Sequence, residues 1–384
     1  SCDETAVSIV EAKGGIKKPQ FKIIADTVIS QIELHKEYGG VFPSLAKREH
    51  TKNLLPVLIT TLKKSGLLIP INKPKLTDNS LQQIERTKQI NKILDREPEL
   101  AKEIINFVSK NKKPKIDAVA VTYGPGLEPA LWTGLNFAKA LALLWNKPFV
   151  PVNHMEGHLG ASLLEPKTKN IKFPALGLLL SGGHTELVLM KNWMKYKTIG
   201  QTRDDAVGEA YDKIARMLGF SYPGGPEVSK SSNECKTEYS KWNLPRPMIG
   251  TPDLDFSFSG LKTAVLYTLK KITKITPTIK KEIAREFEEA VNEVLLKKTK
   301  KALEKYKIQT LILGGGVVAN QRIRKTFTDL GKKTEGLEVL IPNTKYTGDN
   351  ATMIAVAGYF RYLDGKILDP QKTGRIKADG NLRL

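Results

Sequence analysis

The chain has 384 residues, and its 61 Lys and Arg against 40 Asp and Glu give a formal net charge of +21 at pH 7. Such an excess of positive charge favours a polyanionic partner, and we expect RNA, although a lysine-rich background composition would raise the charge as well. The two cysteines, Cys2 and Cys235, are far apart, which argues against a disulfide framework and fits a reducing, cytoplasmic compartment. No apolar run approaches the length of a membrane span, so we expect no membrane partner.

The first part of the chain is expected to form two strands followed by helices. Residues 1–10 are typical of the end of a strand hairpin, and residues 21–29 of a second strand. Ser44 is expected to cap a helix, whose periodicity continues through residues 54–65. Residues from about 69 to 115 are rich in Lys, Asn and Gln and carry apolar residues at helical spacing, which predicts a largely helical surface insertion.

Two strand–turn–helix units of one pattern lie far apart in the sequence. The first has an apolar strand at residues 116–123, a glycine-rich turn and an amphipathic helix at residues 131–145. The second has a strand at residues 308–313, the turn Gly314–Gly316 and a helix at residues 319–330. A long helical segment precedes each unit. This repetition predicts a duplicated α/β architecture with a site between the halves.

Between the two units we expect a second hairpin, with strands at residues 175–180 and 186–189. The turn Ser181-Gly182-Gly183-His184-Thr185 joins them, and its backbone N–H groups could bind phosphate, although most Gly-Gly hairpin turns bind nothing. A helix at residues 205–218 follows, and it carries Asp212.

The remaining elements carry weaker signals. Residues 255–263 alternate aromatic and serine side chains before a helix, and this pattern is also compatible with a well-packed strand edge. The last long helix is expected at about residues 351–363. The basic tail after Gly365 is expected to be poorly ordered.

His154 and His158 give the clearest indication of chemistry. On a helix this spacing places both imidazoles on one face, where they can share one metal ion. The apolar residues 148–152 lead the pair to the end of a buried strand, where open α/β sheets bind their ligands. Glu156 does not follow the first histidine directly, as it would in a zinc protease, and it points about 200° away from His154. Asp349 would ordinarily be a helix cap, yet it is also the best-placed carboxylate for a remaining metal position.

Six motifs occur together and in order. They are His154-Met155-Glu156-Gly157-His158, Ser181-Gly182-Gly183-His184-Thr185, Tyr222-Pro223-Gly224-Gly225-Pro226, residues 255–263, Gly314-Gly315-Gly316-Val317 and Asp349-Asn350. This set closely resembles the bacterial TsaD family, formerly called Gcp, which transfers a threonylcarbamoyl group to tRNA. The resemblance covers nearly the whole chain apart from the insertion and the tail.

The resemblance implies a duplicated actin/Hsp70/sugar-kinase-like (ASKHA) fold of two lobes. Residues 1–165 would form the N-terminal lobe with the insertion, and residues 166–345 the C-terminal lobe. Residues 346–384 would return to the N-terminal lobe as the final helix and end in the basic tail.

The resemblance also implies which residues bind. His154, His158 and Asp349 would hold one divalent metal ion, iron or zinc. The adenylate would be held by Leu179, Leu180, Ser181, Gly182, Gly183, Asp212, Gly225 and Asn320. Asp3 would lie near the same cleft, and Asp3 and His184 are the candidates for a general base. Archaeal relatives carry a tyrosine two residues before the Ser-Gly-Gly turn, where this chain has Leu179 and therefore supplies no phenolate ligand.

In this family the donor is threonylcarbamoyl adenylate. The acceptor is the exocyclic amine of the adenosine that follows the anticodon in tRNAs reading codons that begin with A. Such an amine is a weak nucleophile, so catalysis would come mainly from positioning and charge stabilisation. The chain contains no G-x-x-x-x-G-K-[ST] loop. The resemblance therefore implies a separate adenylate synthase, together with a TsaB-like paralogue and a TsaE-like P-loop ATPase that sustain turnover.

Other functions remain open on the sequence alone. A kinase or a chaperone-like ATPase of the same fold would bind ATP, but it would need acidic residues for magnesium instead of a histidine pair. A stand-alone, organellar-type transferase would need no paralogue. A relative that only binds its partners would not need the complete metal triad. A protease is disfavoured by the position of Glu156.

Overall fold

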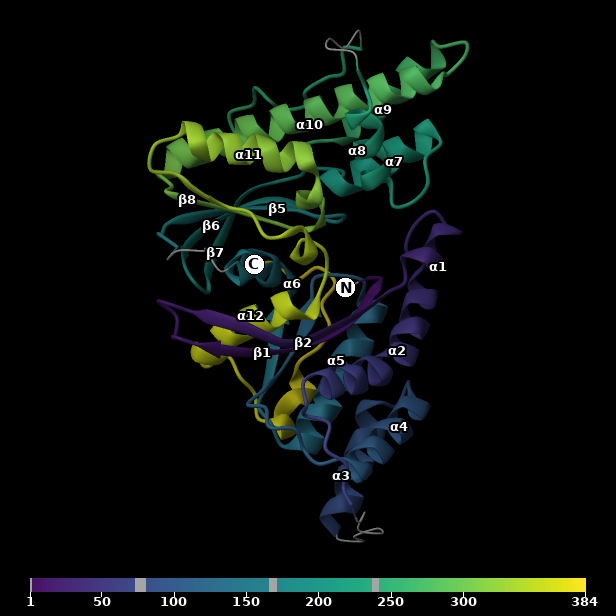
Figure 1. Cartoon of the computed structure of the whole chain (residues 1–384), viewed down its shortest axis with the longest axis vertical. Coiled ribbons are helices and arrows are strands. Elements are labelled where there is room, and N and C mark those ends of the chain that lie inside the picture. Colours follow the sequence, from purple (N-terminus) through teal and green to yellow (C-terminus); the bar gives the residue numbers. More distant parts are fainter. Residues whose placement is uncertain (1, 73–80, 166–170, 237–241) are drawn as a thin grey trace. The chain divides into compact units, whose positions relative to one another are not determined.

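The computed structural model describes residues 2–72, 81–165, 171–236 and 242–384 of the chain (Figure 1). It divides into two compact units. Unit 1 comprises Ser1–His35, Val41–Gly160 and Asp349–Leu384. Unit 2 comprises Lys36–Gly40 and Ala161–Gly348. Both units combine helices with strands, as an α/β fold requires. Among the described residues, none of the helices combines the length and the apolarity that a membrane span needs.

Unit 1 contains two pairs of strands. The antiparallel pair is β1 (Glu4–Lys13) with β2 (Gln20–Ser30), and the parallel pair is β3 (Val119–Gly124) with β4 (Phe149–Asn153). The helices are α1 (Ile32–Lys36), α2 (Pro43–Lys64), α3 (Leu81–Ile93), α4 (Pro98–Lys110), α5 (Glu128–Trp145), α6 (His154–Gly160) and α12 (Ala351–Leu363), with a short 3-10 helix at Pro370–Arg375. A cavity of about 770 Å³ lies in this unit and is lined by residues of β1, β3, α5 and α12.

The helices of unit 1 pack because each of them presents an apolar face. Leu58 of α2, Ile104 and Phe107 of α4 and Phe137 of α5 belong to one buried cluster. The insertion is largely helical, as expected, since it contains α3 and α4, and α4 buries its apolar side in this core. Residues 73–80 of the insertion lie outside the described residues.

Unit 2 is built on one five-stranded sheet. Its strands are β5 (Ala175–Leu180), β6 (Thr185–Asn192), β7 (Lys195–Gln201), β8 (Thr310–Gly314) and β9 (Glu338–Leu340), in the order β7-β6-β5-β8-β9. β5, β6 and β7 are antiparallel neighbours, whereas β5, β8 and β9 run parallel. β5 and β8 are entirely buried, which explains why both strands are apolar without alternation.

The helices of unit 2 supply the rest of its core. They are α7 (Val207–Leu218), α8 (Gly224–Asn233), α9 (Ser259–Lys270), α10 (Pro277–Tyr306) and α11 (Gln321–Lys333), with short 3-10 helices at Ala161–Leu164, Gly316–Ala319 and Thr344–Tyr346. α10 and α11 lie along one face of the sheet (Figure 1), and Phe287 of α10 and Phe327 of α11 are fully buried in the same cluster as Leu178 of β5.

Two expectations about the chain's elements are wrong. Ser44 does not cap α2, because the helix begins at Pro43 and Phe42 occupies the N-cap position without a side-chain hydrogen bond. Proline suits the first helical position because no helical partner is needed for its missing N–H. The tail after Gly365 is ordered: Ala378 is buried against Leu131 and Phe149, although Lys and Arg are frequent around it.

Backbone hydrogen bonds hold this tail on unit 1. The Asp379 N–H donates to the Tyr123 carbonyl at 2.9 Å, and the Gly126 N–H donates to the Gly380 carbonyl at 3.2 Å. The tail therefore covers the end of β3. The alternation at residues 255–263 forms no regular strand: Phe256 makes an isolated bridge with Thr202, and Ser259 begins α9.

Candidate functional site

The two histidines begin and nearly end a short helix that follows the buried strand β4. The side chain of Asn153, the last residue of β4, accepts a hydrogen bond from the Met155 N–H at 2.8 Å. This contact turns the chain into α6, with His154 as its first residue. His158 follows one turn later and is fully buried. The local sequence thus brings both imidazoles to one face of α6, as their spacing predicted.

Two glycines of α6 allow the third residue to come close. A β-carbon at Gly157 would lie 2.9 Å from Cδ1 of Ile354, and one at Gly160 would lie 2.9 Å from Cγ1 of Val356. Both neighbours belong to α12, so the two helices can approach this closely only without side chains at these positions. Asp349 lies two residues before the first residue of α12 and is thereby placed beside the histidines.

Asp349 is free for this role because its neighbour caps the helix. The side chain of Asn350 accepts the hydrogen bond from the Met353 N–H at 2.9 Å, so Asn350 is the N-cap of α12. The alternative that Asp349 is the cap is therefore wrong.

The three side chains converge on a common point. Oδ1 of Asp349 lies 3.1 Å from Nε2 of His154 and 3.3 Å from Nε2 of His158. The ligand atoms of all three lie within 4.8 Å of one another. The side chains are 12%, 0% and 25% exposed for His154, His158 and Asp349 respectively. Nδ1 of both histidines is buried and has no hydrogen-bond partner among the described residues, which is costly unless another group binds there.

The protonation states suit a metal ion. Burial lowers the pKa of His154 to about 4, so its imidazole is neutral near pH 7. The pKa of Asp349 is held well below its usual range because the histidine contacts outweigh the opposing effect of burial. Neutral imidazole nitrogens and a carboxylate are ligands of zinc and of non-haem iron. The residues present therefore fit a divalent metal ion.

Glu156 points away from these ligands, as its position on a helix predicted. Its carboxylate forms two contacts with the Arg361 guanidinium of α12, at 2.5 and 3.1 Å. Arg361 also donates to the Pro151 carbonyl at 2.9 Å. This buried ion pair fixes α12 against α6 and β4. It leaves Glu156 without a role as a general base at the metal.

Asp3 and its neighbours lie in unit 1 with the metal ligands. The Asp3 carbonyl accepts a hydrogen bond from the Gln31 N–H at 2.7 Å, and the Cys2 carbonyl lies 3.3 Å from Nε2 of His50. Nδ1 of His50 lies 2.7 Å from Oγ1 of Thr5. Burial raises the pKa of the Cys2 thiol and lowers that of His50 to about 4. These contacts hold the start of β1 in place, a role of His50 that no motif in the sequence indicates.

The glycine-rich turn after β5 lies in unit 2. The Ser181 N–H donates to the His184 carbonyl at 2.9 Å and the His184 N–H donates to Oγ of Ser181 at 3.0 Å, which closes a tight turn. A β-carbon at Gly182 or Gly183 would meet no atom within 4 Å, so both backbones are open to a ligand. Leu179 and Leu180 are fully buried side chains of β5 and can offer only backbone groups.

Two further segments meet this turn at the carboxyl ends of the parallel strands β5 and β8. A β-carbon at Gly315 would lie 2.2 Å from the Leu180 carbonyl oxygen, and φ is +100° there, so glycine is required. A β-carbon at Gly208 of α7 would lie 2.7 Å from the Ser181 carbonyl oxygen. Such strand ends are where open α/β sheets bind ligands.

Asp212 joins α7 to the turn at the start of α8. Its Oδ1 accepts a hydrogen bond from the Gly224 N–H at 2.8 Å, and burial raises the pKa of its carboxyl group. Gly225 is open to a ligand, because a β-carbon there would meet no atom within 4 Å. Asn320 caps α11 through its side-chain oxygen, which accepts from the Ile323 N–H at 3.0 Å. The structure therefore places Asp212, Gly225 and Asn320 in unit 2 with the Ser181–Gly183 turn.

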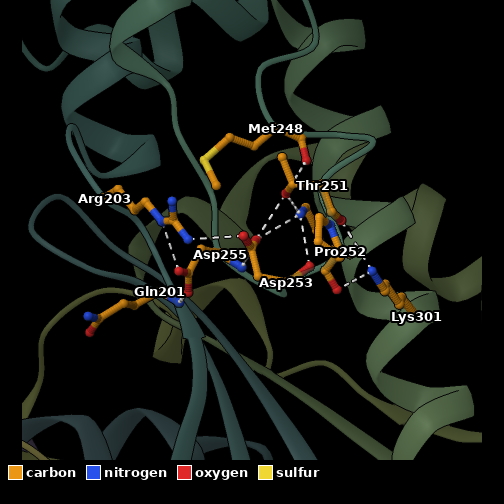
Figure 2. Close-up of polar contacts among 9 residues, drawn as sticks. Gln201, Arg203, Met248, Thr251, Pro252, Asp253, Asp255 and Lys301 are labelled. Carbon is orange, nitrogen blue, oxygen red and sulfur yellow. Dashed lines mark hydrogen bonds and ion pairs between the residues drawn. The ribbon is translucent and has the colours of Figure 1, made fainter.

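The serines between Asp255 and Thr263 are used by the fold. Ser257 and Ser259 both donate to the carboxylate of Asp204, at 2.5 and 2.7 Å, and thereby fix the start of α9. The neighbouring loop is held in the same manner: Figure 2 shows Arg203 between the carboxylates of Asp253 and Asp255, at 3.0 and 2.9 Å.

A lysine of α10 also holds this loop by contacting its backbone. Lys301 contacts the carbonyl oxygens of Thr251 and Pro252 (Figure 2). The hydrogen bonds of Ser257 and Ser259 thus give this motif a structural role in fixing the loop before α9.

Together these features define an α/β protein with a candidate metal site in unit 1 and, in unit 2, a group of glycine-rich turns suited to a phosphate-containing ligand. Comparison with known proteins identifies the family to which the chain belongs. The model of the TsaD family, described as tRNA N6-adenosine threonylcarbamoyltransferase, matches residues 22–70 and 95–356. The chain therefore belongs to the TsaD family of transferases.

Relatives with this description match over nearly their whole length. The protein of Thermosipho melanesiensis is 41% identical over 384 residues, covering 100% of this chain and 98% of its own. That of Staphylococcus aureus strain JH9 is 39% identical over 381 residues, covering 99% and 94%. Among solved structures, full-length HypF in its phosphate- and nucleotide-bound form matches 69% of this chain and 41% of its own, at 13% identity and a TM-score of 0.48. A TM-score this low identifies neither fold nor function.

Proposed function

We propose that this chain transfers the threonylcarbamoyl group of threonylcarbamoyl adenylate to the exocyclic amine of an adenosine in tRNA. The acceptor would be the adenosine that follows the anticodon in tRNAs reading codons that begin with A. The observation that carries the proposal is the convergence of His154, His158 and Asp349 in a chain that matches the TsaD family over most of its length. The net charge of +21 supports a tRNA substrate.

The metal centre would serve the acyl part of the donor. We propose that His154, His158 and Asp349 hold one iron or zinc ion, since their protonation states and their unpartnered nitrogens suit either metal. When bound, such an ion supplies Lewis-acid polarisation of a carbonyl oxygen. Asp349 keeps the ligand set anionic, and the burial of His158 excludes water from one side of it.

The adenylate part would be bound by unit 2. The open backbones of Gly182, Gly183 and Gly225 are suited to approach phosphate and ribose closely. Leu179, Leu180 and Ser181 would contribute backbone groups at the end of β5. Asp212 would accept a ribose hydroxyl, and Asn320 would place the N-terminus of α11 against the nucleotide.

The exocyclic amine must lose a proton during the transfer, and a general base would accept it. Asp3 and His184 are its candidates: Asp3 lies in unit 1, where its backbone is tied to Gln31, and His184 closes the turn after Gly183. The amine is a weak nucleophile, so we expect either residue to contribute less than the positioning of donor and acceptor.

The fold and the partners follow from the same family membership. We propose the duplicated ASKHA arrangement of two lobes, one for each unit. Its support is the repeated strand–turn–helix pattern of β3 with α5 and of β8 with α11. We further propose that the chain acts in the cytoplasm with a separate adenylate synthase, a TsaB-like paralogue and a TsaE-like ATPase.

The decisive experiment compares His154→Ala and His158→Ala with Glu156→Gln in the same helix. Metal content of each purified protein is measured by mass spectrometry, and modified adenosine in tRNA is measured by nucleoside mass spectrometry. We expect both histidine variants to lose metal and product, whereas Glu156→Gln retains metal because its carboxylate contacts Arg361 instead. Full metal content and normal product in His154→Ala would overturn the proposal.

A second experiment tests the partners. With threonine, bicarbonate, ATP and tRNA the chain alone should make no product until a synthase is added. With preformed donor, repeated turnover should stay poor without the paralogue and the ATPase. Sustained turnover by the chain alone would instead favour a stand-alone, organellar-type transferase.

A further inference from the structure

One buried carboxylate in unit 2 has no part in the function described so far. Glu288 of α10 is only 1% exposed. Three other helices surround it: Tyr211 belongs to α7, Ser229 to α8, and Asn320 is the N-cap of α11. A carboxylate this deeply buried is costly unless it is well hydrogen-bonded and its charge is compensated.

The hydrogen bonds around Glu288 converge on one of its oxygens. Oε1 accepts from Oγ of Ser229 at 2.8 Å, from Nδ2 of Asn320 at 2.5 Å and from the Tyr211 hydroxyl at 3.4 Å. The Asn320 amide also contacts Oγ of Ser229 at 2.7 Å and the Tyr211 hydroxyl at 3.2 Å. The four side chains therefore form one closed network.

The charge of Glu288 is compensated from α11. Nε of Arg322 lies 3.4 Å from Oε2 of Glu288, and Arg322 also pairs with Glu289. Burial, reinforced by Glu288, raises the pKa of Tyr211 well above its usual range, so its hydroxyl remains a donor. Ser229, Asn320 and Tyr211 all donate to Glu288, which is therefore the shared acceptor of the network.

Two of the three hydrogen-bond partners of Glu288 lie close in sequence to a candidate adenylate residue, and the third is such a residue. Tyr211 directly precedes Asp212 on α7, and Ser229 lies one turn after Gly225 on α8. The third partner is Asn320 itself, whose side-chain oxygen caps α11 while its nitrogen points to Glu288. A shift of Glu288 would therefore displace α7, α8 and the start of α11, which carry these residues.

We propose that Glu288 is a positioning residue for the adenylate: it fixes α7, α8 and the start of α11 relative to one another from behind the site. This inference rests on the donor site proposed above and adds a residue that contacts no substrate. Its consequence is specific, because loss of the carboxylate should weaken nucleotide binding while leaving the metal centre of unit 1 intact.

The chain offers a matched control two residues away. Glu286 also lies on α10, is 4% exposed and is paired with an arginine: Nη1 of Arg246 contacts its Oε1 at 2.5 Å. Its other partner is the Leu244 N–H, at 3.4 Å. Glu286 thus matches Glu288 in helix, burial and chemistry, but within the described part of the chain its hydrogen bonds go to Arg246 and the Leu244 N–H instead of the candidate adenylate elements.

The test compares Glu288→Gln with Glu286→Gln. Glutamine keeps the shape of the side chain but removes its charge and replaces one acceptor by a donor. Both variants should unfold at lower temperature than the parent chain. AMP binding is measured by calorimetry, and KM for threonylcarbamoyl adenylate and kcat are measured in the tRNA assay with the partner proteins present.

We expect Glu288→Gln to weaken AMP binding and to raise KM by about 10-fold, equivalent to one charge-assisted hydrogen bond, with a smaller change in kcat. Glu286→Gln should bind AMP like the parent chain. Ser229→Ala, which removes a single donor, should show a smaller loss in the same direction and serves if Glu288→Gln does not fold.

Two results would overturn the inference, and only the second would also overturn the proposed adenylate site. Equal AMP affinity in Glu288→Gln and Glu286→Gln would overturn it while the adenylate site stands. Failure of the parent chain to bind AMP or a stable donor analogue would overturn the adenylate site as well.

Discussion

Gly157 lies between the two histidines, and replacing it by alanine tests how closely α6 must approach α12. A β-carbon there would lie 2.9 Å from Cδ1 of Ile354 and 3.1 Å from Cγ of Met353. Both side chains are buried, with exposed fractions of 8% and 1%, so neither can move freely into solvent. We therefore expect Gly157→Ala to push the two helices apart by a few tenths of an ångström.

The size of the effect follows from two opposing contributions. Overpacking of a buried contact costs about 1–3 kcal/mol, whereas replacing glycine by alanine inside a helix gains roughly 1 kcal/mol. The free energy of unfolding should accordingly fall by on the order of 1 kcal/mol. Metal binding should suffer more, because α6 carries two ligands and the start of α12 carries the third. A change in the surroundings of metal ligands typically costs about 10–100-fold in affinity.

Gly134→Ala is the matched control. Gly134 lies within helix α5 of the same unit, and a β-carbon there would meet no atom within 4 Å. Alanine should therefore stabilise the chain slightly without affecting the metal. Zn²⁺ affinity is measured by competition with a chelator, and stability by urea unfolding of the metal-free chain. If Gly157→Ala matched Gly134→Ala in both measurements, the close approach of α6 and α12 would not control the site.

The remaining predictions concern pH, salt and the donor site. Because burial lowers the pKa of His50 to about 4, its stabilising contribution is present above pH 6.5 and is lost as the pH falls from there towards 4. Between pH 7 and pH 5 this amounts to on the order of 2 kcal/mol, so His50→Gln should flatten the pH dependence of urea unfolding, and parallel curves would contradict the assignment. Affinity for tRNA should fall roughly 10³-fold or more between 50 and 200 mM salt if six or more phosphates are neutralised; a flat dependence would mean that a partner carries the RNA contact. Gly225→Val should raise the donor concentration needed for half-maximal rate without lowering the melting temperature, since its β-carbon meets no protein atom, whereas unchanged donor affinity would place the site elsewhere.

The elements that carry the site could be predicted because their signals are local. The last helix spans Ala351–Leu363, as its periodicity indicated, and the apolar strand β5 spans Ala175–Leu180. The spacing of His154 and His158 needs only helical geometry to bring the rings together, and their centroids are 4.7 Å apart. Local pattern was therefore sufficient for two of the three residues of the candidate metal site.

What the sequence did not show depends on contacts between distant segments. Glu288 is one of many glutamates in the 30-residue helix α10, and nothing in that helix distinguishes it until Asn320 and Ser229 are placed against it. The order of the tail was missed because its basic composition conceals backbone bonds such as that from Asp379 to Tyr123. Composition indicates the conformation of an isolated segment. The position of Glu288 and the order of the tail both depend instead on contacts with residues that are distant in the sequence.

The position of Asp349 depends both on local sequence pattern and on contacts between distant segments. From the sequence, Asp349 and Asn350 are equally good caps for α12, because either side chain can accept a hydrogen bond from the first turn. Asn350 takes the cap in the structure. The glycines of α6 then bring the start of α12 within reach of the histidines, and the carboxylate that the helix does not need becomes the third candidate ligand. An amide at position 349 and a carboxylate at 350 would cap the helix as well, but would leave the two imidazoles without a carboxylate ligand beside them.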